Sequence, residues 1–225
     1  VDKTLSKVCE GKTPSEILNI SVADIACGSG IFLEEAFAYL QDYCVQWYIC
    51  NGQTDHLIET GIDLYKLPLQ EKKDILCSCI YGIDIDIHAV EVAKFSLLIK
   101  LIEDETAPSV SEVVPILPDL GDNIQFGNSL VSQTELNGIS GANRQMMEIA
   151  PFDWSTINNG CGFDVIIGNP PYVNTEGMHA LLPSAEVEVY KKKYKTSHKQ
   201  FDKYFIFIEQ AINKINENGL VCYIV

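Results

Sequence analysis

The feature that most constrains this chain is an alternation of short apolar runs with segments of helical periodicity. Each run has the length and the side-chain content of a β-strand, and turns or helical patterns separate the runs. The five runs are Ile20–Ile25, Cys79–Ile85, Asn123–Phe126, Phe163–Ile167 and Leu220–Val225. Strands that are apolar throughout and alternate with helices indicate a parallel sheet covered on both faces. We therefore predict a doubly wound α/β fold with a mostly parallel sheet.

The segments between the runs divide into helical and irregular ones. Helical periodicity covers Ile31–Ile49, Leu64–Cys77, Ala89–Ile102 and Asp202–Ile215. Within residues 34–78 the pattern predicts an insertion of two helices. Residues 133–159 are rich in Gly, Ser, Asn and Pro, which predicts an irregular loop, and residues 174–199 read as a second long loop. No internal repeat is present, so residues 1–225 are predicted to form a single domain.

Composition excludes several classes of protein. With 225 residues, 47% of them hydrophobic and 21% charged, the chain is neither disordered, nor collagen-like, nor a small disulfide-rich module. It contains no uncharged apolar run of the length that a membrane-spanning helix needs, and no secretory signal. Its eight cysteines lack CxxC spacing, so we expect free thiols, no metal site and a cytoplasmic location. The net charge of −15 argues against a broad nucleic-acid surface, although not against a local one.

A glycine-containing turn follows the first predicted strand. Its sequence is Asp24-Ile25-Ala26-Cys27-Gly28-Ser29-Gly30, and small residues at such a turn let the backbone approach a ligand closely. Leu33 replaces the third glycine of the dinucleotide fingerprint and no G-K-[ST] motif is present, so a pyrophosphate or triphosphate is not expected. Asp84 ends the second strand, where an acid can accept hydrogen bonds from ribose hydroxyls. The two features predict a nucleotide-like ligand, and Asp86 is placed to cap the next helix.

The sequence Asn169-Pro170-Pro171-Tyr172 follows a strongly apolar run and bears most directly on the chemistry. Two consecutive prolines give a stiff, extended turn that lacks backbone donors and holds Tyr172 at a fixed height. The side-chain oxygen of Asn169 and the carbonyl of Pro170 can accept two hydrogen bonds from an exocyclic amino group, while Tyr172 stacks on its ring. These bonds favour tetrahedral geometry at a nitrogen whose lone pair is otherwise delocalised. The motif therefore predicts chemistry at an amino nitrogen.

Taken together, these motifs resemble the S-adenosylmethionine-dependent adenine-N6 DNA methyltransferases of restriction–modification and phage-defence systems. Within them the chain is similar to the branch in which the cofactor motif precedes the catalytic motif. Asp24–Phe32 resembles the glycine motif of the family, Asn123–Leu130 its third cofactor motif and Asn169–Tyr172 its catalytic motif. Phe201–Glu209 and Asn218–Leu220 resemble the helix and strand that follow. The resemblance covers nearly the whole chain and implies a Rossmann-like methyltransferase fold.

The resemblance implies a set of residues that bind S-adenosylmethionine. They are Asp24, Ala26, Cys27, Gly28, Gly30, Asp84, Ile85, Asn128 and Ser129. In this arrangement Asp24 holds the methionine amino group, and the backbone of the glycine turn lines the cofactor. Asp84 binds the ribose, and Ile85 lies beside the adenine of the cofactor. Asn128, at a position where the family often has Asp, and Ser129 take the polar edge of that adenine.

The resemblance also implies that Asn169, Pro170, Pro171 and Tyr172 act on the N6 amino group of an adenine flipped out of duplex DNA. The enzyme would be the modification part of a restriction–modification system. Because the sequence begins without a methionine and stops inside an apolar run, we expect a fragment of a longer protein, truncated at both ends. A target-recognition domain and, in enzymes that also cleave, an endonuclease domain would lie in the rest of that protein.

A cluster of six lysines follows the catalytic motif, namely Lys191, Lys192, Lys193, Lys195, Lys199 and Lys203. Lys191, Lys192, Lys193 and Lys195 are candidates for contacts with DNA phosphates, which position DNA without reading its sequence. A solvated lysine face on a loop and helix start is the alternative interpretation.

Three other functions fit parts of the same pattern. A protein-glutamine methyltransferase also carries N-P-P-Y, an RNA amino-group methyltransferase uses the same chemistry, and a methylase-like domain without activity would only bind DNA or a partner. The insertion at residues 34–78 and the sequence A-C-G-S-G favour the DNA enzyme, and the presence of Asn169 and Tyr172 argues against the non-catalytic alternative. No Pro-Cys nucleophile is present where Asn169-Pro170 stands, which argues against a cytosine-C5 methylase.

Overall fold

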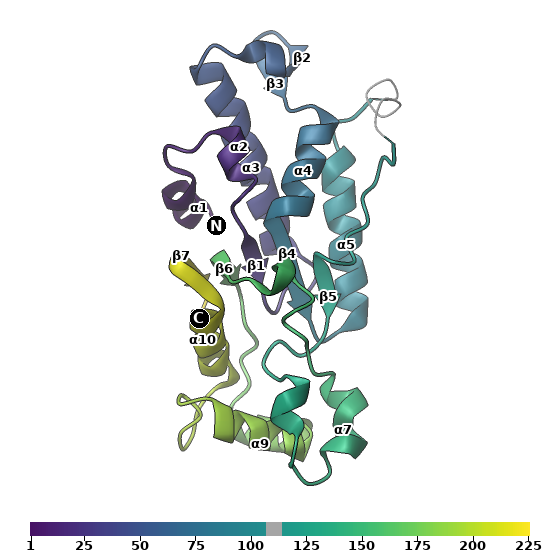
Figure 1. Cartoon of the computed structure of the whole chain (residues 1–225), viewed down its shortest axis with the longest axis vertical. Helices are drawn as coiled ribbons and strands as arrows, with labels where there is room; N and C mark the ends of the chain where they lie inside the picture. The colour runs from purple at the N-terminus through teal and green to yellow at the C-terminus, as the bar shows by residue number, and fades with distance from the viewer. Residues whose placement is uncertain (107–113) are drawn as a thin grey trace.

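A five-stranded parallel sheet forms the centre of the molecule in the computed structural model, which describes residues 1–106 and 114–225 (Figure 1). Its strands, in chain order, are β1 (Val22–Asp24), β4 (Ile80–Asp84), β5 (Ile124–Phe126), β6 (Phe163–Gly168) and β7 (Ile215–Tyr223). In space their order is β5-β4-β1-β6-β7, and every neighbouring pair is parallel. The predicted parallel α/β sheet is confirmed.

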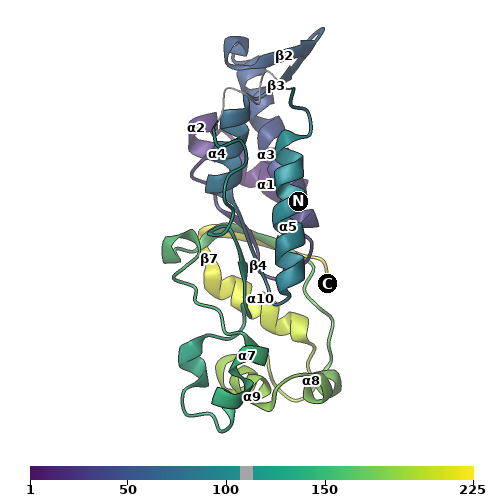
Figure 2. The same cartoon turned by 90° about the vertical axis from the view of Figure 1, so that its right-hand side faces the viewer.

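Alternation of side chains along the strands explains why helices cover both faces. Val22, Ile80 and Val165 belong to one apolar core, whereas their chain neighbours Ala23 and Ile166 belong to the other. The first core is completed by α3 (Ile31–Cys50), α4 (Leu69–Cys79) and α5 (Ile87–Ile102), and the second includes α10 (Lys203–Lys214). Figure 2 shows α5 and α10 on opposite sides of the sheet.

Two short helices at the start of the chain, which the sequence pattern does not predict, pack on the first core. They are α1 (Asp2–Cys9), which buries Leu5, and α2 (Pro14–Ile17), which buries Ile17. Thr13 begins α2 with a capping box, since its hydroxyl accepts a bond from the Glu16 amide and the Glu16 carboxylate accepts one from the Thr13 amide.

The predicted two-helix insertion is wrong in detail, because a β-hairpin lies between its helices. The strands of the hairpin are β2 (Ile58–Gly61) and β3 (Leu64–Lys66), which pair antiparallel after a short 3₁₀ turn, η1 (Thr54–His56). The predicted helix from Leu64 therefore begins only at Leu69. Pro68 explains the late start, because its ring disfavours helical geometry in the residue before it.

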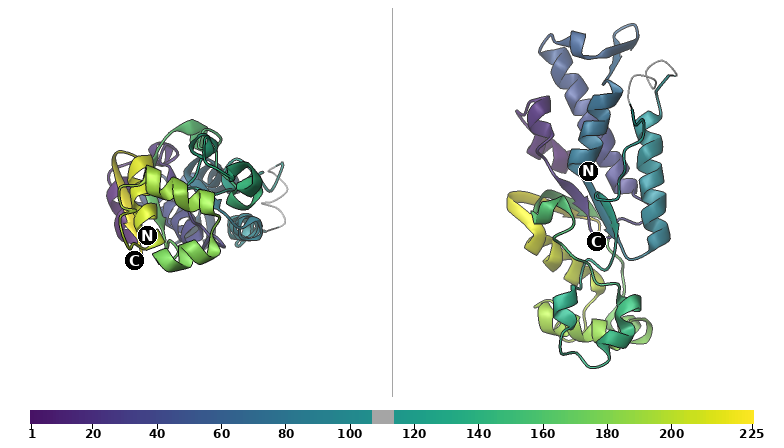
Figure 3. Two further views of the ribbon diagram at one scale, coloured as in Figure 1. Left: turned by 90° about the horizontal axis from the view of Figure 1, so that it is seen from below. Right: turned by 45° about the vertical axis from the view of Figure 1, so that its right-hand side comes forward.

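Both segments predicted as long loops contain helices. Residues 133–159 hold α7 (Ala142–Ile149) with the 3₁₀ turns η2 (Gln133–Leu136) and η3 (Asn158–Gly160), and residues 174–199 hold α8 (Thr175–Leu181) and α9 (Ser184–Lys193). Polar residues that suggested loops are in fact helix caps, as where the Asn174 side chain accepts a bond from the Gly177 amide at 2.8 Å. Figure 3 shows α7 and α9 together at the end of the molecule opposite the β2–β3 hairpin.

Candidate active site

A cavity of about 260 Å³ lies where the carboxyl-terminal ends of β1, β4, β5 and β6 meet. The order of the strands reverses direction at β1, because the chain first continues to β4 and β5 and then returns to β6 on the other side. Open α/β sheets bind ligands at such switch points. The cavity is lined by Ile25, Ala26, Asp84, Ile85, Gly127, Asn128, Ser129, Asn169, Pro171, Lys203 and Phe207.

Seven residues singled out from the sequence thus share one cavity, namely Ala26, Asp84, Ile85, Asn128, Ser129, Asn169 and Pro171. The other predicted residues are outside its lining, namely Asp24, Cys27, Gly28, Gly30, Pro170 and Tyr172. Lys203 and Phe207 also line the cavity. Sequence reasoning assigned no role to Phe207 and included Lys203 only in the lysine cluster considered for contacts with DNA phosphates. Their spacing of four on α10 places them on one helix face, and this signal could have revealed them.

Asp24, at the end of β1, is almost completely buried. Its Oδ1 accepts a hydrogen bond from the Ala26 amide at 3.0 Å, whereas Oδ2 has no hydrogen-bond partner among the described residues. Burial raises the pKa of Asp24 to about 7, against the effect of the Ala26 bond and with a further contribution from the charge of Asp84. A buried carboxyl oxygen without a partner suits a cationic donor.

Gly168, at the end of β6, lies close to this carboxyl group. A Cβ atom at position 168 would lie 2.6 Å from Oδ1 of Asp24, so only glycine fits there without displacing the carboxyl group. The next strand places Tyr223 opposite Gly168, and the hydroxyl of Tyr223 is also buried without a partner in the described ranges. The charge of Asp24 adds to burial in raising the pKa of that hydroxyl. Two unpaired polar atoms thus mark this end of the site.

The glycine turn is joined directly to Asp84. The Gly28 amide donates to Oδ2 of Asp84 at 2.8 Å, and the Asp86 amide donates to Oδ1 at 2.9 Å. Gly28 has a φ of +54°, in the left-handed region, and no heavy atom lies within 4 Å of where its Cβ would be. Asp86 caps α5 by accepting a bond from the His88 amide, as predicted.

Cys27 and Gly30 have mainly structural contacts. Cys27 is buried, and burial raises the pKa of its thiol, which keeps the thiol neutral. Gly30 starts α3 with a φ of +89°, and a Cβ there would lie 3.0 Å from the Cβ of Ala93. The glycine therefore lets α3 begin close against α5.

The side chains of Asn128 and Ser129 both form hydrogen bonds within the protein. Nδ2 of Asn128 donates to Oε1 of Glu186 at 3.0 Å, and its Oδ1 accepts from the Leu130 amide at 3.1 Å. The hydroxyl of Ser129 donates to the Ile25 carbonyl at 2.6 Å. These bonds fix the segment after β5 against the end of β1.

The Asn169–Tyr172 turn continues from β6 and is held by two other segments. The Tyr172 hydroxyl donates to the Ile224 carbonyl at 3.0 Å, and its ring centre lies 5.8 Å from that of Tyr204. Just beyond the turn, the Val173 amide donates to Asp202 at 2.9 Å. Tyr172 is nevertheless 55% exposed.

The four lysines proposed for DNA contact lie at the end of α9 and just after it, rather than at the start of a helix. Lys193 is half-buried, pairs with Glu135 at 2.9 Å and donates to the Leu130 carbonyl at 2.9 Å. Lys192 is exposed and pairs with Glu188, and Lys191 lies 3.3 Å from His179. Lys193 is therefore engaged in contacts within the protein, whereas Lys191, Lys192 and Lys195 are exposed.

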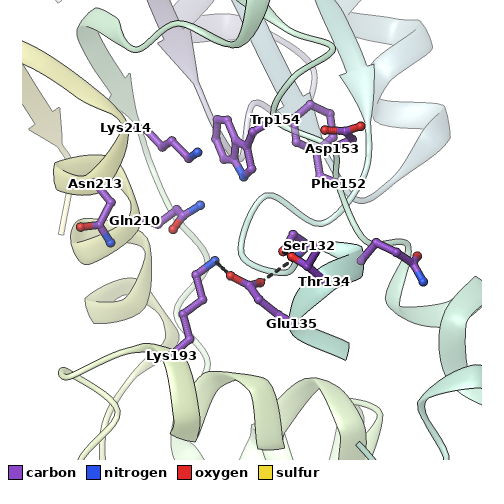
Figure 4. Close-up of a pocket in the computed structure, with 11 residues that line it drawn as sticks. Ser132, Thr134, Glu135, Phe152, Asp153, Trp154, Lys193, Gln210, Asn213 and Lys214 are labelled. Atoms are coloured by element: carbon purple, nitrogen blue, oxygen red, sulfur yellow. Dashed lines mark hydrogen bonds and ion pairs between the residues drawn. The ribbon is translucent and has the colours of Figure 1, made fainter. Parts of the chain in front are cut away.

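A larger cavity of about 480 Å³ adjoins the segment after β5 (Figure 4). Its lining includes Glu135, Trp154, Lys193, Gln210 and Lys214. Two of these side chains support the segment that lines the smaller cavity, since Gln210 donates to the Ser129 carbonyl at 2.8 Å and Lys193 donates to the next carbonyl. Lys193 is the single residue of the predicted site in its lining. Size alone therefore does not locate the site.

Neither a metal cluster nor a membrane-spanning helix is found among the described residues. Across residues 1–106 and 114–225, no three His, Cys, Asp or Glu side chains are grouped to hold a metal ion. In the part of the chain that the structure describes, no helix is both long enough and apolar enough to cross a membrane.

The fold and the cavity define a parallel α/β domain with a cavity at the carboxyl ends of its strands, beside the Asn-Pro-Pro-Tyr turn. The model of the Eco57I restriction-modification methylase family matches residues 78–225. The chain belongs to this family, which confirms the resemblance drawn from its motifs.

Individual relatives agree with this assignment. The type II restriction enzyme and methyltransferase RM.Eco57I of Escherichia coli is 45% identical over 224 residues, which are 100% of this chain and 21% of the relative. The chain therefore spans about a fifth of the length of that curated relative. Two solved structures share the fold, each with a TM-score of 0.55 and each covering 99% of this chain. One is a nuclease-deletion mutant of the Type ISP restriction-modification enzyme LlaGI with a DNA substrate mimic, 16% identical over 16% of that chain. The other is a DrdV–DNA complex, 17% identical over 18% of that chain.

Proposed function

We propose that this chain is the catalytic domain of a DNA methyltransferase that transfers the methyl group of S-adenosylmethionine to the N6 amino group of adenine. The observation that carries the proposal is the single cavity in which Asp84 and the Asn128–Ser129 segment meet Asn169. Membership of the Eco57I methylase family supports it. Under this proposal residues 1–225 act as one catalytic domain.

The residues at the cavity fit the cofactor. Its methionine moiety carries an ammonium group, and Oδ2 of Asp24 is a buried acceptor with no partner in the described ranges. Asp84, at the end of β4, is placed for ribose hydroxyls, and the half-exposed Ile85 offers an apolar surface to the adenine. When bound, S-adenosylmethionine supplies an electrophilic methyl group on a sulfonium centre.

The Asn169 turn is proposed to prepare the target nitrogen. The Asn169 side-chain oxygen and the Pro170 carbonyl accept the two N–H bonds of the amino group, which frees its lone pair for attack. Tyr172 stacks on the flipped base and offsets part of the cost of leaving the duplex. Its hydroxyl bond to the Ile224 carbonyl fixes the ring, so the base meets an oriented surface.

DNA is the proposed partner, and further domains of a longer protein are proposed to recognise the target sequence. The structures of LlaGI and DrdV that share this fold are described as complexes with a DNA substrate mimic and with DNA. RM.Eco57I is described as both a restriction enzyme and a methyltransferase. The acidic charge of this chain leaves most of the affinity for DNA to those further domains.

The test is transfer of a radiolabelled methyl group from S-adenosylmethionine to DNA by the full-length protein, followed by digestion to nucleosides. We expect the label on N6-methyl-2′-deoxyadenosine. We expect Asn169→Ala to abolish transfer with nearly unchanged cofactor affinity, because its bonds form in the transition state. Label on cytosine or on protein, or wild-type rates from the Asn169 variant, would overturn the proposal.

Two variants of Tyr172 distinguish the effect of base stacking from that of the hydrogen bond between the Tyr172 hydroxyl and the Ile224 carbonyl. Tyr172→Ala should slow transfer about tenfold or more, because stacking of a base on an aromatic ring contributes about 1–3 kcal/mol. Tyr172→Phe keeps the ring and loses only the bond to Ile224, so its rate should stay close to that of the wild type. Equal losses of rate in both variants would assign the effect to the hydrogen bond with Ile224 and not to stacking.

A further inference from the structure

A network of buried polar side chains lies directly behind the cofactor cavity. Its members are Glu186, Tyr190, Asn128 and Lys203, with exposed fractions of 1%, 0%, 4% and 8%. Oε1 of Glu186 accepts hydrogen bonds from Nδ2 of Asn128 at 3.0 Å and from the Tyr190 hydroxyl. Nζ of Lys203 lies 3.6 Å from the same oxygen. The network therefore holds a buried ion pair, one member of which lines the cavity.

Stability alone is a weak reason for such a pair. Removing both charges from water has a desolvation penalty that their attraction often does not exceed, and an apolar pair of similar size is frequently at least as stable. Burial also lowers the pKa of Lys203, while the Glu186 carboxylate opposes that change. A buried ion pair at the wall of a ligand cavity points to a role toward the ligand.

The polar side chains at the cavity differ in how many of their hydrogen-bonding groups already have partners within the protein. Both ends of the Asn128 amide are bonded to Glu186 and Leu130, and the Ser129 hydroxyl is bonded to the Ile25 carbonyl. These side chains, which the sequence assigned to the polar edge of the cofactor adenine, therefore have their bonds within the protein. The Lys203 ammonium has three donors, and its separation of 3.6 Å from Glu186 is longer than a normal hydrogen bond. It retains donors for an acceptor in the cavity.

We propose that Lys203, positioned by Glu186, donates a hydrogen bond to a ring nitrogen of the cofactor adenine. The inference rests on the proposed function, because it takes S-adenosylmethionine as the ligand. The ring nitrogens of adenine are acceptors, which an ammonium group complements. Ile85 and Phe207 line the same cavity and supply apolar surface for the faces of the ring. Lys203 is then a binding residue, and Glu186 is a positioning residue.

The experiment measures binding without DNA, so that a contact of Lys203 with DNA cannot produce the effect. Calorimetry on the full-length protein compares S-adenosylhomocysteine with its 1-deaza, 3-deaza and 7-deaza analogues, each of which lacks one ring nitrogen. Lys203→Met, which removes the ammonium at nearly constant length, should weaken S-adenosylhomocysteine about tenfold or more. It should leave the affinity of one deaza analogue unchanged, because that analogue has already lost the acceptor. Lys203→Arg should recover part of the affinity, and Glu186→Gln should reduce discrimination among the analogues.

Each outcome decides the inference. Equal weakening of all four ligands by Lys203→Met would assign Lys203 a structural role and overturn it, as would a change of less than twofold. The wild type alone gives an independent decision: equal affinity for all three deaza analogues and the parent compound overturns the inference even if a variant fails to fold. Lys100→Met, which changes a partly exposed lysine near the end of α5, is the control and should leave all four affinities unchanged. Failure of the wild type to bind S-adenosylhomocysteine would instead refute the proposed function.

Discussion

Replacing Asp24 with asparagine should stabilise the ligand-free protein at pH 8 and weaken its binding of S-adenosylmethionine. The Asp24 carboxyl group is buried, accepts one backbone bond and leaves Oδ2 without a partner in the described part of the chain. Its pKa of about 7, against an ordinary value of 3.8, means that the charged form is disfavoured in the folded protein. At about 1.4 kcal/mol for each pH unit, this difference corresponds to about 4 kcal/mol of lost stability above pH 7.

The direction of the pH dependence follows from the raised pKa. Between pH 3.8 and about 7 the folded protein retains a proton that the unfolded chain has lost, so the free energy of unfolding falls as the pH rises through this range. Above about pH 7 the contribution is constant. Between pH 5 and pH 8 we expect Asp24 to account for a loss of about 2–3 kcal/mol in the wild type. The asparagine side chain of the variant cannot ionise and removes that loss, although its amide nitrogen lacks an acceptor, which costs about 1–3 kcal/mol at every pH.

Urea unfolding at pH 5 and pH 8, followed by circular dichroism, measures the effect. The matched control is Asp119→Asn, because Asp119 is exposed and accepts the same type of bond, from the Gly121 amide at 2.8 Å. The control should keep the pH dependence of the wild type, whereas Asp24→Asn should flatten it. Calorimetry should show that Asp24→Asn weakens S-adenosylmethionine about tenfold or more, since a charge-assisted hydrogen bond contributes about 1.5–3 kcal/mol. Parallel pH dependences for the wild type and Asp24→Asn would refute the reasoning.

Two further predictions concern the glycine turn and the lysines of α9. In denaturant titrations, Gly30→Ala should lower the free energy of unfolding by more than Gly138→Ala. Both positions have a positive φ, at which a side chain costs about 1–3 kcal/mol. A Cβ at position 30 would in addition lie 3.0 Å from Ala93 of α5, whereas a Cβ at position 138 would have no heavy atom within 4 Å. Equal losses would show that α5 yields to the new methyl group. The second change replaces Lys191, Lys192 and Lys195 together with Gln in the full-length protein. The slope of log affinity for DNA against log salt concentration should then fall in magnitude by about 0.9 for each phosphate that is no longer neutralised. The target sequence should stay unchanged. An unaltered slope would show that these lysines serve only solubility.

The sheet and the meeting of the motifs could be predicted from the sequence because both depend on local pattern. Apolar runs that alternate with helices specify a parallel sheet, and the carboxyl ends of parallel strands lie at one edge. Asp84 and Asn169 are 85 positions apart in the chain, yet Asp84 ends a strand that pairs with β1 and Asn169 follows another. Their approach in one cavity therefore needed no knowledge of side-chain packing.

The Glu186–Lys203 pair could not be predicted in the same way. Glu186 lies on α9, within a segment whose helix caps read as loop signals, and nothing local shows that this helix turns its carboxylate toward the end of β5. The wrong prediction for the hairpin at β2 and β3 has a similar cause, since Leu64–Cys77 keeps an apolar pattern across Pro68. Contacts of this kind depend on how helices pack after the sheet has formed.

The charges around the cavity together determine which charge of ligand is favoured there. Asp84 lines the cavity and Glu186 lies behind Asn128, so two carboxyl groups accompany the ammonium of Lys203 in this part of the described structure. Asp24, beneath the adjoining turn, adds to the negative charge above about pH 7. A low-dielectric cavity with an excess of negative charge favours a cationic ligand over an anionic one. A sulfonium cofactor meets that condition, whereas a pyrophosphate or triphosphate does not, which agrees with the missing third glycine and the missing G-K-[ST] motif. The same field should hold the cationic cofactor more tightly than the neutral thioether that remains after methyl transfer, so the electrostatics that favour binding also favour release of the product.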